Sequence, residues 1–296
     1  MKRALLLSIA IVLAACGGGG SSSPTGPGTV STDTSVAAKC RDGGDGVVRD
    51  GWTRTIGDDY VTAKNGDVAL AIVYSFAIDD PMRNAAHFAE GAWDKLLGAE
   101  YTVGQRSSGG DGAGLLPYSE GTAVEIASGN PVYVMVVAPR SNGIVYPTIA
   151  IAPSQQALKA KVASPDALAA LRGLNYFPLD CTGVGGKWTS SSVDAVQTYD
   201  ANGYFTGINV TSLRIDVAFD PSGQYSFKAK VTSNTGVQRE DETGTFTVGG
   251  QLITLNGSAG KTTNFDAGFV AVRGGIALQI TDQQYVGDQW LLFRAP

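Results

Sequence analysis

A strict alternation of apolar and other residues in the last third of the chain most constrains how it can fold. Apolar side chains occupy every second position from 213 to 219 and again from 225 to 231. Turn-forming residues separate such runs at 220–223, 249–250, 256–257 and 274–275. A period of two with regular turns predicts an antiparallel meander in which each strand has one buried face.

The segment from Trp188 to the end of the chain holds about eight such strands by this pattern. Eight antiparallel strands are enough to close into a small barrel. The sequence therefore predicts an all-β antiparallel barrel for a C-terminal domain over residues 182–296.

Short motifs in this domain carry a family resemblance. Gly186-Lys187-Trp188 matches the Gly-x-Trp that opens the lipocalin-like (calycin) barrels, and Arg294 matches the arginine that covers that tryptophan. Thr281-Asp282 is similar to the later Thr-Asp-Tyr of these proteins, with Gln283 at the tyrosine position. The domain thus resembles a calycin barrel, and the resemblance implies that Gly186, Trp188 and Arg294 serve barrel closure.

Aromatic residues of the same domain are candidates for lining an apolar ligand cavity. The alternative is that they fill the interior, because an eight-stranded barrel is often just wide enough for its own side chains. The candidates are Phe219, Tyr225, Phe227, Phe246, Phe265 and Phe269.

Residues 40–181 read as an α+β domain, with an antiparallel sheet and two or three helices. Asp80 and Pro81 are suited to start a helix whose apolar residues recur at helical spacing as far as Leu97. Ser164 and Pro165 predict a second helix. The order of strands and helices resembles the PsbP/Mog1-like fold of small secreted proteins.

The N-terminal residues predict export and lipidation. Lys2 and Arg3 precede an apolar run over residues 4–15, which is far shorter than the roughly 20 residues that span a bilayer. The run ends in Leu-Ala-Ala before Cys16, and this order resembles a bacterial lipoprotein signal. We therefore expect a signal peptide over 1–15, a lipid on Cys16, and a flexible Gly/Ser/Pro tether over 16–39.

Two cysteines remain after Cys16. An exported chain meets an oxidising compartment, in which an even number of cysteines is usually bonded. We therefore expect a Cys40–Cys181 disulfide, with two unrelated thiols as the alternative.

Composition and motifs exclude several functions. The formal net charge is −5 and lysine and arginine form no stripe, so we expect no nucleic-acid partner. His87 is the only histidine, which excludes a multi-histidine metal site within one chain, and we expect it to lie within the first helix as an ordinary helix-face residue. No catalytic motif is apparent, and we expect no catalytic residues, metal or cofactor.

Three functions remain open. The first is a non-catalytic binding module for a small apolar ligand in the barrel. The second is a partner-binding or assembly accessory protein, and the third is a carboxylate-based hydrolase, which requires a carboxyl group with a raised pKa. Gly17 follows Cys16 where an aspartate would favour inner-membrane retention, so we expect an anchor in the outer membrane facing the periplasm.

Overall fold

A computed structural model describes residues 51–112, 114–141, 143–179, 183–199, 205–233, 236–283 and 289–295. The described chain divides into two compact units, the first ending at Leu174 and the second beginning at Asn175. The sequence predicted this boundary after Cys181. The earlier boundary follows from a short strand, β11 (Tyr176–Phe177), which pairs with a strand of the second unit.

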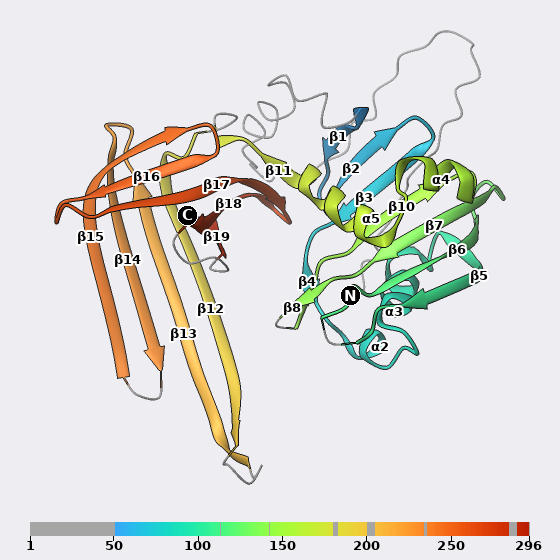
Figure 1. Ribbon diagram of the computed structural model, residues 1–296, viewed down its shortest axis with the longest axis horizontal. Coiled ribbons are helices and arrows are strands. Elements are labelled where there is room, and N and C mark those ends of the chain that lie inside the picture. Colours follow the sequence, from blue (N-terminus) through green and yellow to red (C-terminus); the bar gives the residue numbers. More distant parts are fainter. Residues whose placement is uncertain are drawn as a thin grey trace, which may run out of the picture. The chain divides into compact units, whose positions relative to one another are not determined.

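The first unit is built on a seven-stranded antiparallel sheet in the order β1-β2-β3-β10-β7-β6-β5 (Figure 1). A separate three-stranded sheet has the order β4-β9-β8. The strands are β1 (Thr53–Ile56), β2 (Tyr60–Asn65), β3 (Val68–Val73), β4 (Phe76–Ala77), β5 (Tyr101–Gly109), β6 (Tyr118–Glu125), β7 (Pro131–Val137), β8 (Arg140–Ser141), β9 (Ile144–Val145) and β10 (Thr148–Ala152).

Short helices accompany this sheet, as expected for an α+β unit. One group contacts β5, β6 and β7, and a second group contacts β3, β7 and β10. They are α2 (Asp80–Arg83), α3 (Phe88–Leu97), α4 (Gln155–Lys161), α5 (Pro165–Ala170) and the 3₁₀ turn η2 (Leu171–Asn175).

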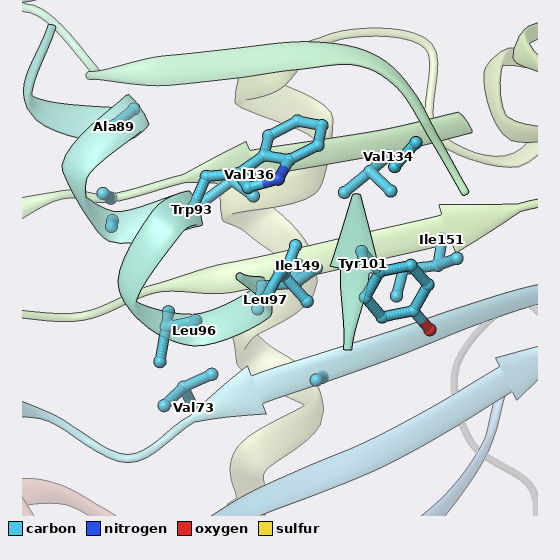
Figure 2. Packing of buried hydrophobic residues seen from close by; sticks show 14 of the residues in the cluster. Val73, Ala89, Trp93, Leu96, Leu97, Tyr101, Val134, Val136, Ile149 and Ile151 are labelled. Atoms are coloured by element: carbon cyan, nitrogen blue, oxygen red, sulfur yellow. The ribbon is translucent and has the colours of Figure 1, made fainter. Parts of the chain in front are cut away.

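Helix α3 buries one face against the sheet (Figure 2). Trp93 and Leu97 are fully buried and belong to one core cluster with Val134, Val136 and Ile149. These strand residues alternate along β7 and β10, so they share one face of the sheet. This packing holds α3 against β6 and β7 and thereby fixes the helix face that points away from the core.

The helix expected from Asp80 to Leu97 is interrupted in the structure. It forms two helices, α2 and α3, and the cap of α2 is Asp79, whose side chain accepts a hydrogen bond from the Met82 amide. The predicted cap at Asp80 is therefore off by one residue. Pro81 does occupy the first turn, where its missing N–H costs no hydrogen bond.

The second unit contains a closed antiparallel barrel of eight strands, as the alternation predicted. Each strand pairs with the next along the chain, and the last strand returns to pair with the first. The strands are β12 (Gly186–Tyr199), β13 (Phe205–Phe219), β14 (Gln224–Ser233), β15 (Gly236–Gly249), β16 (Leu252–Gly257), β17 (Thr262–Val272), β18 (Gly275–Asp282) and β19 (Gln289–Arg294).

Four strands of the barrel run beyond its closed part (Figure 1). Strand β15 pairs with β14 along ten residue pairs but meets β16 only from Gly244 onward. Strand β12 pairs with β19 only at Trp188 and Thr189, near its own beginning. Strands β12 to β15 therefore form an extension that is continuous with the barrel wall.

Candidate functional site

The barrel closes where β12 meets β19. Trp188 and Arg294 are directly opposite each other in this pairing, and the Arg294 guanidinium carbon lies 5.0 Å from the centroid of the Trp188 ring. The indole N–H of Trp188 donates to the Val184 carbonyl oxygen at 2.7 Å. Gly186 opens β12 with a φ of 115°, a conformation that favours glycine. The structure thus brings together the residues that the calycin resemblance implied.

The six aromatic candidates all lie on the barrel strands, but they differ in burial. Phe219, Tyr225, Phe265 and Phe269 are buried, whereas Phe227 and Phe246 are half-buried. Some rings contact one another: the centroids of Phe219 and Phe246 are 4.8 Å apart, and those of Phe269 and Trp188 are 5.9 Å apart. Aromatic side chains therefore supply a large part of the inner surface.

The Tyr225 hydroxyl is an unusual group on this inner surface. The residue is only 4% exposed, and among the described residues its hydroxyl makes no hydrogen bond of good geometry, although the Glu242 carboxylate is close enough to interact with it. Burial, and then the nearby Glu242 carboxylate, raise the pKa of Tyr225, so the hydroxyl stays protonated. A buried hydroxyl without a partner costs free energy, and a ligand group that completes its hydrogen bond would recover it.

An apolar ladder connects this buried surface with the extension. It consists of the cross-strand pairs Phe219–Tyr225, Val217–Phe227, Ile215–Ala229 and Leu213–Val231 of β13 and β14. Burial falls along the ladder, because Phe219 and Tyr225 are buried while Leu213 and Val231 are half-buried. Residues directly opposite in an antiparallel pair share one face. Over β13 and β14 the inner face of the barrel therefore continues as a partly exposed apolar surface, which Glu242 and Glu240 border on β15.

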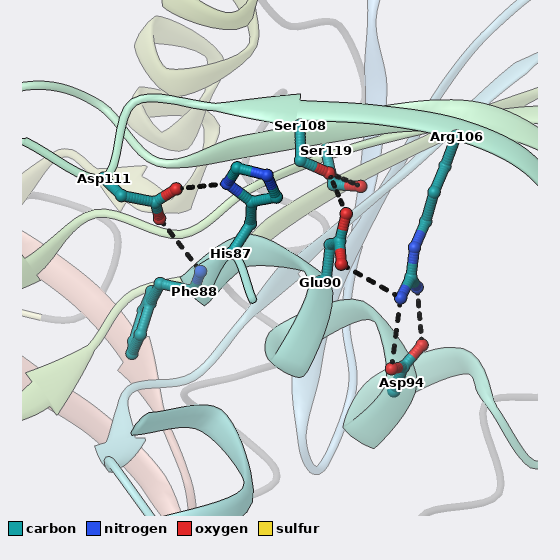
Figure 3. Close-up of polar contacts among 8 residues, drawn as sticks. All are labelled: His87, Phe88, Glu90, Asp94, Arg106, Ser108, Asp111 and Ser119. Atoms are coloured by element: carbon teal, nitrogen blue, oxygen red, sulfur yellow. Dashed lines mark hydrogen bonds and ion pairs between the residues drawn. The ribbon is translucent and has the colours of Figure 1, made fainter. Parts of the chain in front are cut away.

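A polar ladder between α3 and β5 is a second candidate site, which the sequence analysis missed (Figure 3). Its helical members follow one another at spacings of three and four residues, so they share one face of α3 and its cap. Its pairs are His87–Asp111, Glu90–Ser108 and Asp94–Arg106.

Asp111 fixes the beginning of α3. Its carboxylate lies 2.6 Å from His87 Nδ1 and accepts a hydrogen bond of 2.9 Å from the Phe88 amide. Burial opposes the ionisation of Asp111, but these hydrogen bonds outweigh it and lower the pKa of its carboxyl group. His87 is the N-cap residue of α3 with extended backbone angles, and makes no side-chain cap of its own. The expectation that His87 lies within the helix is therefore wrong.

The other two pairs extend the contact along the helix. Ser108 donates to Glu90 at 2.8 Å and lies 2.9 Å from the Ser119 hydroxyl. Arg106 donates to Asp94 at 2.6 Å and to Glu90 at 3.3 Å. Each carboxylate of the ladder thus has a donor partner. This arrangement attaches the glycine-rich end of β5 to α3 and is suited to a structural role.

The described residues include no group of three or more histidine, cysteine or acidic side chains that could hold a metal ion. In the same part of the chain, no helix has the length and apolarity needed to cross a membrane. Cys16, Cys40 and Cys181 lie outside the described residues, so the lipidation and the disulfide stay predictions. No known protein family, curated protein or solved structure matches this chain, and its C-terminal unit is classed by its architecture, a closed eight-stranded antiparallel barrel.

Proposed function

We propose that the protein is a non-catalytic, lipid-anchored protein of the cell envelope whose lipocalin-like barrel binds a small molecule with an apolar body and one polar group. The observation that carries this proposal is the buried Tyr225 hydroxyl, which makes no well-formed hydrogen bond among the described residues and lies among buried aromatic side chains, with the Glu242 carboxylate as a polar neighbour. Small-molecule sites typically combine apolar walls with a few polar groups that orient the ligand.

The apolar ladder supports a route to that surface. It leads from the half-buried pair Leu213–Val231 to the buried pair Phe219–Tyr225 without a charged residue among its members. A ligand that follows this face can exchange water for apolar contact at each step, at about 25 cal/mol per Å² of apolar surface buried. Glu242 lies near Tyr225 and would disfavour an anionic head group there. The proposed ligand is therefore neutral or cationic at its polar end.

The hydrolase alternative has less support. Among the described residues, four aspartates have a pKa that departs from the usual value, and in all four it is lowered: Asp79, Asp111, Asp216 and Asp220. A general acid at neutral pH needs a shift in the opposite direction. The proposed location, an outer-membrane anchor through Cys16, rests on the N-terminal sequence alone.

A fluorescent apolar probe with one N–H group, N-phenylnaphthylamine, tests the barrel. We expect its fluorescence to rise on binding and the affinity to fall about fivefold in Tyr225→Phe, since a neutral hydrogen bond contributes about 1 kcal/mol. Tyr133→Phe is the matched control, because Tyr133 contacts Gln155 in the other unit. The proposal is overturned if the wild type gives no fluorescence rise, or if both variants weaken binding equally.

A further inference from the structure

The first half of β15 has an open edge. From Val237 to Glu242 this strand pairs with β14 on one side, and no described residue pairs with it on the other. The open stretch ends at Thr243, whose carbonyl accepts a hydrogen bond of 2.8 Å from the Ser258 amide. Val237 is 53% exposed, so the stretch is accessible at its beginning.

The backbone of this edge is oriented for pairing. In an antiparallel strand, the N–H and C=O of one residue point to the same side, and this side alternates along the strand. Thr243 points its carbonyl away from β14, so Asp241, Arg239 and Val237 do the same. Each of these residues presents both backbone groups to the open side, as the template for a further strand requires.

Charges on the outer face of the extension are unevenly arranged. Arg214, Lys230 and Arg239 are directly opposite one another on β13, β14 and β15, which forms a row of three cations. Like charges at directly opposite positions are destabilising. Among the described residues, Arg214 is the one member of the row with an ion pair, a 2.9 Å contact with Asp216 on its own strand. Asp241 lies two residues from Arg239 on the same face of β15, and no described residue is opposite Arg239 on the open side of this strand.

We propose that the open edge of β15 pairs with the same edge of a second copy of this chain, in antiparallel orientation about a two-fold axis through Glu240. In this register Arg239 of each copy is opposite Asp241 of the other, and the two can exchange backbone hydrogen bonds. The row of cations then ends on an acidic residue of the second copy. Two-fold pairing uses the same surface on both copies and closes without polymerising.

The neighbouring registers are less favourable. A shift of the axis by one residue toward the N-terminus places Arg239 opposite Arg239, and the same shift toward the C-terminus places Asp241 opposite Asp241. Side-chain alternation excludes intermediate registers, because directly opposite residues must share a face. The proposed register has one unfavourable pair, Glu240 opposite itself. This pairing does not depend on a ligand in the barrel.

Charge reversal tests the proposed register by sedimentation of the purified protein over a wide concentration range. We expect the wild type to show a concentration-dependent monomer–dimer equilibrium. Arg239→Glu and Asp241→Arg should each weaken the dimer about tenfold, because each turns two opposite-charge pairs into like-charge pairs. The double variant should dimerise as well as the wild type, because it restores both pairs with their signs exchanged.

Two further variants separate pairing from misfolding. Glu240→Gln should tighten the dimer, since it removes the one like-charge pair, and a folding defect would not produce this result. Lys64→Glu, at an exposed position of β2 in the other unit, is the control and should leave the equilibrium unchanged. A monomer at every concentration overturns the proposal, and so does a dimer that is indifferent to both charge reversals. Larger assemblies would instead indicate head-to-tail pairing and would also overturn the two-fold register.

Discussion

Substitution of Arg294 and Trp188, separately and together, measures the interaction energy between the two side chains where the barrel closes. Arg294 is exposed, and its guanidinium carbon lies 5.0 Å from the Trp188 centroid. A cation over an indole ring at an exposed site contributes about 0.5–1 kcal/mol. Arg294→Ala should therefore lower the free energy of unfolding by about that amount, and Arg294→Lys should recover only part of it, because a lysine lacks the planar guanidinium that stacks on the ring.

Trp188→Phe should have a larger effect. The indole is 1% exposed and its N–H donates to the Val184 carbonyl, so the variant loses packing and also leaves a buried carbonyl without its donor. An unsatisfied buried group of this kind costs about 1–3 kcal/mol. Arg294→Ala should lower the free energy of unfolding by less in the Trp188→Phe background than in the wild type, because the phenyl ring attracts the guanidinium less strongly.

Urea denaturation followed by circular dichroism gives the four free energies of this cycle. The expected interaction energy is about 0.5 kcal/mol or more, with the double variant losing less than the sum of the single variants. Losses that add within about 0.3 kcal/mol would refute a direct interaction between the two side chains.

Three other changes have defined outcomes. Asp111→Ala should lower the free energy of unfolding by about 0.5–2 kcal/mol at pH 7, because α3 loses its cap. Since the folded-state pKa of Asp111 is lowered, the difference between variant and wild type should shrink as the pH falls below about 4. Urea denaturation at pH 7 and below about pH 4 checks this. Gly268→Ala should cost about 1–3 kcal/mol, because the new Cβ would lie 2.2 Å from the Tyr176 ring, whereas Gly249→Ala, with nothing within 4 Å, should be tolerated in the same assay. Cys16→Ser should abolish fatty-acid labelling, and unchanged labelling would disprove lipidation there.

The barrel was predictable because its information is local and repeated. Alternation along each strand and turn residues between strands gave the eight strands and their antiparallel order. The contact of Trp188 with Arg294 came from a motif resemblance, since residues so far apart in the chain have no local signal of contact. The extension of β12 to β15 beyond the barrel was not predicted, because the end of each pairing depends on where the neighbouring strand stops.

The interruption between α2 and α3 shows why the polar ladder was missed. Apolar residues from Met82 to Leu97 keep a helical period across the break, so periodicity alone predicts one helix. The second helix begins at Phe88 because Asp111, from the loop after β5, accepts the hydrogen bond of its amide. Such a cap comes from a distant segment and leaves no local pattern. The spacing of His87, Glu90 and Asp94 was the one available signal.

Native mass spectrometry of the protein purified in mild detergent from its own host tests the central claim most directly. The account predicts a retained small molecule that is apolar, carries a neutral or cationic polar group, and is lost more readily from Tyr225→Phe than from Tyr133→Phe. A bare polypeptide mass in both the wild type and the variants, under conditions that keep the barrel folded, would contradict the account.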